Sequence, residues 1–241
     1  MKKLILTTAA LALTAGAALA QDTIRLGTEG AYPPYNFIND AGEVDGFERE
    51  LGDALCAKAG LTCEWVTNEW DSIIPNLVSG NYDAIIAGMS ITDARDELID
   101  FTQNYYPPTA SAFVGLSADA DTVTGTISAQ VSTIQAAHIA ETGATLMEFA
   151  TPEETVGAVR DGEVDAVLAD YDYLLPIVDA SGGELVFVGE RVPLGGGVGM
   201  GIRETDPELR DAMDAGITAM KADGSLNALL IKWFGEATPQ Y

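Results

Sequence analysis

The fold of this chain is decided by residues 70–95, which read WDSIIPNLVSGNYDAIIAGMSITDAR. Apolar residues at helical spacing follow Trp70 and end at Gly80, which can adopt the left-handed conformation of a helix C-cap. An apolar strand over 84–87 then runs into a small polar turn over 88–92. Open α/β sheets bind ligands where buried parallel strands end in this way. The backbone N–H groups and hydroxyls of the turn, together with Arg95, form a set of donors that suits a carboxylate.

The same unit occurs again at residues 159–170, VRDGEVDAVLAD. In both copies a helix, a glycine cap, an Asp-Ala pair and an apolar strand follow one another. The second strand ends on Asp170, whereas the first leads to Arg95. Two α/β halves that present opposite charges would form a cleft for a zwitterion. An alternative interpretation, in which Gly-x-x-Asp-Ala only caps helices, explains the glycines but not the complementary charges.

These segments resemble the periplasmic solute-binding proteins of polar amino-acid ABC transporters (family 3), a group that includes the lysine/arginine/ornithine- and histidine-binding proteins. The resemblance covers nearly the whole chain after residue 20. The matching segments are GTEGAYPPYNF at 27–37, VDGFE at 44–48, residues 70–95, FTQNYY at 101–106, VDAVLAD at 164–170, and residues 195–203 and 223–235. Their number and order make the signal specific, although no single motif decides it.

The resemblance implies an α/β fold of the two-lobed periplasmic-binding-protein type (type II-like), with a ligand cleft between lobes joined by a two-segment hinge. We expect lobe one over 22–107 plus 192–241 and lobe two over 108–191. Helices are expected at 48–59, 72–79, 94–100, 135–142, 152–160, 171–179, 207–222 and 225–234. The glycine run at 195–197 is expected to be a turn before a return strand over 198–202. A phosphate-binding loop is the alternative, but no Lys-Ser/Thr pair follows the run.

The N-terminus predicts export. Two lysines, an apolar run and Ala18-Leu19-Ala20 before Gln21 have the pattern of a signal peptide over 1–20, cleaved after Ala20. An uncleaved membrane anchor is the alternative. Gln21 rather than cysteine follows the cleavage site, so a lipid anchor is not expected. The expected location is the periplasm.

The two cysteines of the chain, Cys56 and Cys63, lie in the exported part. An even number of cysteines in an oxidising compartment indicates a disulfide, and the resembling basic-amino-acid binders carry a pair in this region. A zinc site is not expected with two cysteines and one histidine. We expect no metal and no cofactor.

The composition is strongly acidic, with a formal net charge of −25. Such a chain is a poor partner for nucleic acid, because phosphate binding needs a basic surface. The charge would steer cationic solutes weakly toward the protein, but acidic surfaces are also an adaptation to salt. The expected partners are a small-molecule amino acid and, from the resemblance, transient contact with an inner-membrane ABC permease. The protein itself is expected to be a monomer.

Arg95 is the residue expected to hold the α-carboxylate of the ligand. Its planar guanidinium matches a carboxylate with two parallel hydrogen bonds and stays charged at working pH. A surface ion pair with a neighbouring acid is the alternative for Arg95. Gly88, Ser90 and Thr92 would add backbone N–H groups and hydroxyls to the same carboxylate. Thr92 could instead cap the next helix.

Asp170 is expected to accept from the ligand α-ammonium, since an isolated acid at a buried strand end otherwise lacks a partner. Tyr32 and Trp70 match family positions whose rings pack on the ligand side chain from opposite sides, an arrangement that suits an aliphatic stem and a cationic end. Ordinary core packing is the alternative for Trp70.

In the second lobe, residues 129–133 lie where the family has a Gly-Ser/Thr-Thr loop that opens a helix. Free N–H groups at Ser132 and Thr133 would help to hold the carboxylate. The sequence departs from the family here, because Val131 replaces the usual glycine and the preceding segment is shorter.

An enzyme is the rival class, since cyclohexadienyl dehydratases share this fold. They need an additional general acid on the helix after the second strand, where this chain has Asp172 and Tyr173. His138 is the sole histidine, so no Ser-His-Asp or Cys-His set can form. We therefore expect no catalytic residues and a transport binder rather than an enzyme.

The expected substrate depends on Glu29. This residue matches the acidic position that pairs with the distal cation in lysine/arginine/ornithine binders, and it precedes Tyr32 by three positions. Its alternative role is to order the turn at Gly30. Opine-like derivatives remain a further possibility, but Asp170 argues for a free primary ammonium. Arginine, lysine or ornithine is expected, with histidine next.

Overall fold

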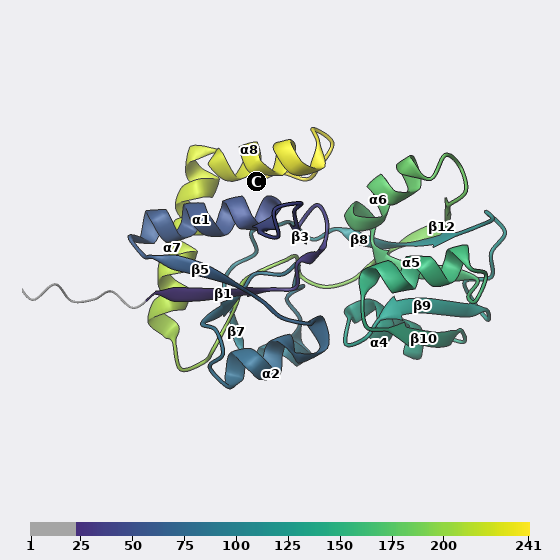
Figure 1. Ribbon diagram of the computed structural model, residues 1–241, viewed down its shortest axis with the longest axis horizontal. Helices are drawn as coiled ribbons and strands as arrows, with labels where there is room; N and C mark the ends of the chain where they lie inside the picture. The colour runs from purple at the N-terminus through teal and green to yellow at the C-terminus, as the bar shows by residue number, and fades with distance from the viewer. Residues whose placement is uncertain (1–22) are drawn as a thin grey trace, which may run out of the picture.

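The computed structural model describes residues 23–241, which form two lobes side by side (Figure 1). In this part of the chain each lobe is built on a five-stranded sheet with helices on both faces. The predicted signal peptide, its cleavage after Ala20 included, lies outside the described residues. No helix within 23–241 is long and apolar enough to cross a membrane.

The sheet of the first lobe has the strand order β5-β1-β6-β13-β7. Its strands are β5 (Cys63–Thr67), β1 (Ile24–Thr28), β6 (Ala84–Ile85), β13 (Gly201–Ile202) and β7 (Asp100–Phe101). β1 runs parallel to β5 and β6, and β13 is antiparallel to both its neighbours. A small antiparallel sheet of β2 (Ala31–Tyr32), β3 (Asn36–Ile38) and β4 (Val44–Asp45) extends this lobe.

Helices cover the two faces of this first sheet (Figure 1). On one side lie α1 (Phe47–Ala59), α7 (Pro207–Asp223) and α8 (Ser225–Phe234), which contact one another. On the other side lie η1 (Trp70–Ser72) and α2 (Ile73–Val78). The short α3 (Asp93–Asp96) follows the turn after β6. Each face has its own hydrophobic cluster, one around Phe47 and Leu51 and the other around Ile73 and Leu77.

The sheet of the second lobe has the order β10-β9-β11-β8-β12. Its strands are β10 (Thr145–Phe149), β9 (Thr126–Gln130), β11 (Ala166–Asp170), β8 (Ala110–Gly115) and β12 (Val186–Pro193), and its helices are α4 (Ile134–Ala140), α5 (Pro152–Arg160) and α6 (Tyr171–Ala180). β9 is parallel to β10 and β11, while β8 is antiparallel to β11 and β12. Two clusters, around Val167 and around Leu168, form the core of this lobe.

The chain passes between the two sheets twice, after β7 and again before β13. At the second passage Val198 forms isolated bridges with Ser90 and Tyr106, so the return segment lies against the outgoing one. Gly195 and Gly197 have φ of 72° and 91°, which agrees with the predicted turn. The predicted strand over 198–202 joins the sheet only at its last two residues.

Most predicted helices are confirmed within one or two residues, and 152–160 and 225–234 match at both ends. The helix expected over 94–100 is wrong, because it ends at Asp96. Ile99 is fully buried, and the next two residues pair with β13 as strand β7, so the chain must turn after Asp96. The strand expected over 84–87 is likewise shorter in the sheet and ends at Ile85.

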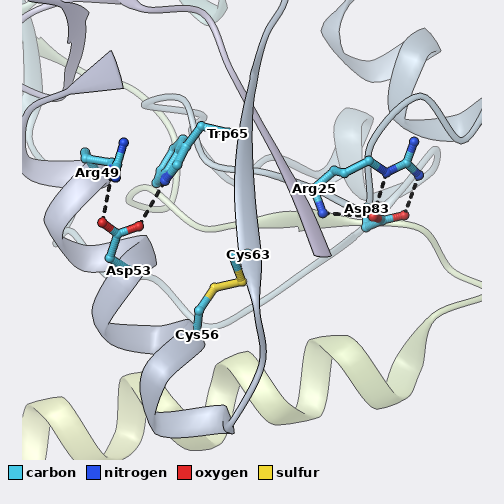
Figure 2. The surroundings of a disulfide bond; sticks show 7 residues. All are labelled: Arg25, Arg49, Asp53, Cys56, Cys63, Trp65 and Asp83. Carbon is cyan, nitrogen blue, oxygen red and sulfur yellow. Dashed lines mark hydrogen bonds and ion pairs between the residues drawn. A yellow bond between two sulfur atoms is a disulfide. The ribbon is translucent and has the colours of Figure 1, made fainter. Parts of the chain in front are cut away.

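The predicted disulfide is present. Cys56 in α1 and Cys63 in β5 are bonded, with their Cα atoms 6.2 Å apart (Figure 2). The bond closes the connection between the helix and the edge strand of the first sheet. Nearby, Asp53 of α1 accepts from the indole N–H of Trp65 at 3.0 Å, which ties the same two elements together a second time (Figure 2).

Candidate ligand-binding site

A cavity lies between the lobes where the parallel strands of both sheets end, the usual position for ligands in open α/β sheets. The first lobe contributes residues that follow β1, β5 and β6, and the second lobe contributes the ends of β9 and β11 and the start of α4. The lining residues are Glu29, Tyr32, Trp70, Ala87, Gly88, Ser90, Arg95, Gln130, Thr133, Ile134, Gln135 and Asp170.

A buried carboxylate holds the two first-lobe turns that line this cavity. Glu48, fully buried in α1, accepts from the Gly88 N–H at 2.6 Å and from the Asn36 side-chain amide at 2.7 Å. The Asn36 amide oxygen in turn accepts from the N–H of Gly30 at 2.7 Å, and the Tyr105 hydroxyl also donates to Glu48. The N–H of Gly88 is thus already engaged, so the expectation that it is free for a ligand is wrong.

Arg95 reaches the cavity from α3. Its guanidinium lies 5.3 Å from the Trp70 ring centroid and donates to the carbonyl oxygen of Ser90 at 2.8 Å. A second contact, at 3.3 Å, crosses to the Ser132 carbonyl of the other lobe. Burial lowers the pKa of Arg95 to about 10, and the charge of Asp170 opposes this shift. Arg95 therefore remains a cation at neutral pH, with its planar face on an aromatic ring.

Neither acid near Arg95 in the chain accounts for its position. Asp93 and Glu97 are both exposed, and the ion pairs of the described residues do not join either of them to Arg95. The surface ion pair considered from the sequence is therefore not formed.

Asp170 ends β11 on the opposite side of the cavity. Its two oxygens accept from the Tyr32 hydroxyl and from the Gln135 side chain, each at 2.9 Å. Burial raises the pKa of Asp170 to about 6, and the hydrogen bond from Tyr32 opposes the shift. The Tyr32 ring stacks on Tyr173 of α6 with centroids 4.2 Å apart. Tyr32 thus connects the first lobe to the second through both its ring and its hydroxyl.

Glu29 follows β1 and faces the second lobe. Its carboxylate accepts from the Gln130 amide at 2.6 Å, and the same amide nitrogen donates to the Ala150 carbonyl at 3.1 Å. Burial raises the pKa of Glu29 to about 7, while the hydrogen bond from Gln130 lowers it. Glu29 lines the cavity at the end that Trp70 also lines.

Trp70 has both roles considered from the sequence. It belongs to the core cluster with Ile73 and Leu77 and is 7% exposed, yet it also lines the cavity. Its indole N–H has no hydrogen-bond partner among the described residues.

The chain also matches a known protein family over most of its length. The family model of the bacterial extracellular solute-binding proteins, family 3, matches residues 24–236. The chain belongs to this family. The predicted membership is therefore confirmed, and the predicted two-lobed fold is confirmed by the two sheets and by the solved structure described next.

Several known binding proteins are similar to this chain over nearly their full length. A periplasmic His/Glu/Gln/Arg/opine family-binding protein from Silicibacter pomeroyi, crystallised in complex with lysine, is 73% identical; the match has a TM-score of 0.90 and covers 91% of this chain and 100% of that one. The L-arginine-binding protein of Pseudomonas aeruginosa is 30% identical over 251 residues, 97% of each chain. The histidine-binding periplasmic protein of Escherichia coli is 30% identical over 259 residues, again 97% of each.

Two residues predicted from the family pattern lie outside the cavity lining. The Thr92 hydroxyl accepts from the N–H of Arg95 at 3.3 Å and caps α3, the alternative considered from the sequence. Ser132 adopts a left-handed conformation with φ of 58°, and its carbonyl, not its N–H, faces Arg95. Thr133 does line the cavity, but its hydroxyl donates to Gln130 O and caps α4. The loop that carries Val131 instead of glycine thus presents an acceptor to Arg95.

Asp172 and Tyr173, which stand where a related enzyme would need a general acid, do not line the cavity. Asp172 accepts from the Tyr106 hydroxyl at 2.9 Å, and Tyr173 stacks on Tyr32.

Sequence analysis missed Gln130 and Gln135. Both side chains are buried and each donates to a cavity carboxylate. Gln130 is the last residue of the largely buried strand β9, and a long polar side chain at the end of such a strand was the available signal.

Proposed function

We propose that this family 3 protein binds a basic L-amino acid between its lobes and delivers it to an ABC permease of the inner membrane. One observation carries the proposal. The cavity places a cation, Arg95, and two carboxylates, Asp170 and Glu29, at separate positions on its wall. A basic amino acid has the complementary set of an α-carboxylate, an α-ammonium and a distal cation.

The perturbed pKa values support this assignment. Burial disfavours the charged form of all three side chains, lowering the pKa of Arg95 to about 10 and raising those of Asp170 and Glu29 to about 6 and 7. Such shifts concentrate at functional sites. A ligand that brings the opposite charge to each group would offset the cost of keeping it ionised.

The cross-lobe contacts suggest how binding and closure are linked. Tyr32 to Asp170 and Gln130 to Glu29 join the two lobes directly. We infer that the ligand α-ammonium takes over or shares the Asp170 carboxylate, and that the distal cation does the same at Glu29. The closed arrangement is favoured because the ligand contacts both lobes at once.

The related proteins support the substrate class and the location. The protein from Silicibacter pomeroyi was crystallised with lysine, and two other relatives are named for arginine and histidine. We propose a periplasmic location, a signal peptide cleaved after Ala20, and lobe boundaries at 107/108 and 193/194. The second boundary differs from the expected 191/192 because Val192 and Pro193 pair with β8 in the sheet of the second lobe. The Cys56–Cys63 disulfide fits an oxidising compartment.

A thermal-shift screen of the common amino acids, ornithine and an opine tests the proposal. Lysine, arginine or ornithine at 100 times its Kd should add about 2.7 kcal/mol to the free energy of unfolding. For a chain of this size that corresponds to a rise in Tm of roughly 5–10 °C. A larger rise in Tm with a neutral amino acid, an acidic amino acid or an opine would contradict the proposal that the ligand is a basic amino acid.

Arg95→Lys tests the role of the guanidinium. The variant keeps the charge but loses the planar pair of donors. Affinity for lysine, measured by calorimetric titration, should fall strongly while circular dichroism stays unchanged. Wild-type affinity in a folded variant would refute the role of Arg95.

A further inference from the structure

Gln130 connects the two lobes at the end of the cavity assigned to the distal cation. It ends β9 in the second lobe and is 8% exposed. Its amide nitrogen lies 2.6 Å from the Glu29 carboxylate of the first lobe. The environment of the Glu29 carboxylate thus depends on an amide from the other lobe, just as that of Asp170 depends on the Tyr32 hydroxyl.

The orientation of this amide is fixed by a second acceptor. The same nitrogen donates to the Ala150 carbonyl at 3.1 Å, so its two hydrogens have two acceptors. A flipped amide would place its oxygen against a carbonyl and a carboxylate. Gln130 can therefore present only donors to Glu29.

A donor in this position favours the ionised carboxylate over the protonated one. Ionised Glu29 in a closed cavity needs a positive partner, because an unpaired buried charge is costly. A neutral ligand leaves that charge unpaired, whereas a distal ammonium or guanidinium pairs with it.

We propose that Gln130 is a specificity-determining residue, which favours the ionised form of Glu29 as the lobes close and so makes closure selective for ligands with a distal cation. This inference rests on the proposed function of the same site. In this proposal a residue of the second lobe, Gln130, controls the selection of cationic ligands, although the carboxylate that binds the cation, Glu29, belongs to the first lobe.

The test compares two ligands that differ only in the distal ammonium, L-lysine and L-norleucine. The affinity for norleucine is measured by titrating lysine into protein that is preloaded with norleucine, so that weak binding can also be quantified. Gln130→Met keeps the length of the side chain and removes its donors. Because a hydrogen bond to a charged group is lost, lysine affinity should fall by roughly tenfold or more, while norleucine affinity should change less than about threefold.

Gln135→Met is the matched control. Gln135 is a buried amide of the same lobe that donates to Asp170 at 2.9 Å. Both ligands carry the α-ammonium assigned to Asp170, so this variant should weaken both of them equally. Only Gln130→Met should change the ratio of the two affinities.

A double-mutant cycle completes the test. In a Glu29→Gln background, Gln130→Met should no longer change the affinity ratio, since the carboxylate it acts on is gone. An unchanged ratio in the single variant, or equal losses for both ligands, would overturn the role of Gln130. If Gln130→Met fails to fold by circular dichroism, Gln130→Leu is measured in its place. Failure of the wild type to bind lysine would instead overturn the proposed function itself.

Discussion

Replacing Glu29 by glutamine should stabilise the protein without ligand and weaken its binding of lysine. Burial raises the Glu29 pKa from 4.5 to about 7, so the folded protein holds this proton more tightly than the unfolded chain does. Folding is then opposed by the ionised carboxylate. The opposition is absent below pH 4.5, grows between pH 4.5 and 7, and is complete above pH 7.

The size of this effect follows from the shift. At 1.36 kcal/mol for each pH unit, the shift corresponds to at most about 3 kcal/mol. Glu29 is only partly buried by accessible surface, so solvent screening lowers the expected gain to about 1–3 kcal/mol at pH 8. At pH 4 Glu29→Gln should leave the free energy of unfolding nearly unchanged.

The affinity for lysine should fall in Glu29→Gln, although the free energy of unfolding rises. Loss of one partner from a buried charge pair costs about 2–5 kcal/mol, which predicts a loss of lysine affinity of at least about 30-fold. Urea denaturation at pH 4 and pH 8 measures the first effect, and calorimetric titration at pH 8 measures the second. Glu69→Gln, a change at an exposed carboxylate near the cavity, is the control and should alter neither quantity substantially.

Two results would refute the reasoning. A lower free energy of unfolding for Glu29→Gln at pH 8 would show that the carboxylate stabilises the fold and that desolvation does not dominate its energetics. Unchanged lysine affinity would show that Glu29 is not the partner of the distal cation.

Three further predictions concern other parts of the molecule. Changing Cys56 and Cys63 to alanine should lower the free energy of unfolding by about 2.5 kcal/mol in urea denaturation under non-reducing conditions, since the closed loop is short; an unchanged midpoint would contradict it. Glu48→Leu leaves three donors without an acceptor and should cost about 3 kcal/mol or more in the same assay, whereas a cost under about 1 kcal/mol would show that the buried network is dispensable. Norleucine affinity should fall as the pH drops through about 6, where Asp170 takes up a proton and can no longer pair with an ammonium; titrations from pH 5 to 8 that show no decline would exclude this role.

The fold was largely predictable because its signals are local. Gly80 ends its helix with φ of 79°, and the Cys pair joins adjacent elements. The helix after Thr92 was predicted too long because its end depends on the pairing of β7 with β13, about a hundred residues later in the chain. The propensities of neighbouring residues carry no information about a pairing with so distant a strand.

The charged residues of the site were also predictable. Asp170 stands at the end of its strand, and Arg95 lies in the short helix that follows the matching strand of a similar unit. The supporting amides were not. Gln130 acquires its role only when Glu29, 101 positions away, is brought to it across the two lobes. Thr92 shows the converse difficulty, because helix capping and ligand binding need the same residue types and only the position of the hydroxyl distinguishes them.

The separate cores of the two lobes set the energetic scale of any motion between them. Each sheet buries its apolar residues against its own helices, and Tyr32 is the aromatic residue that packs against clusters of both lobes. Separating the lobes therefore exposes one stacked ring pair and a few polar contacts while both interiors stay dry. A small solute that adds even a few contacts beyond those it replaces is then enough to favour the closed arrangement. Changing between the two arrangements therefore needs no unfolding of either lobe.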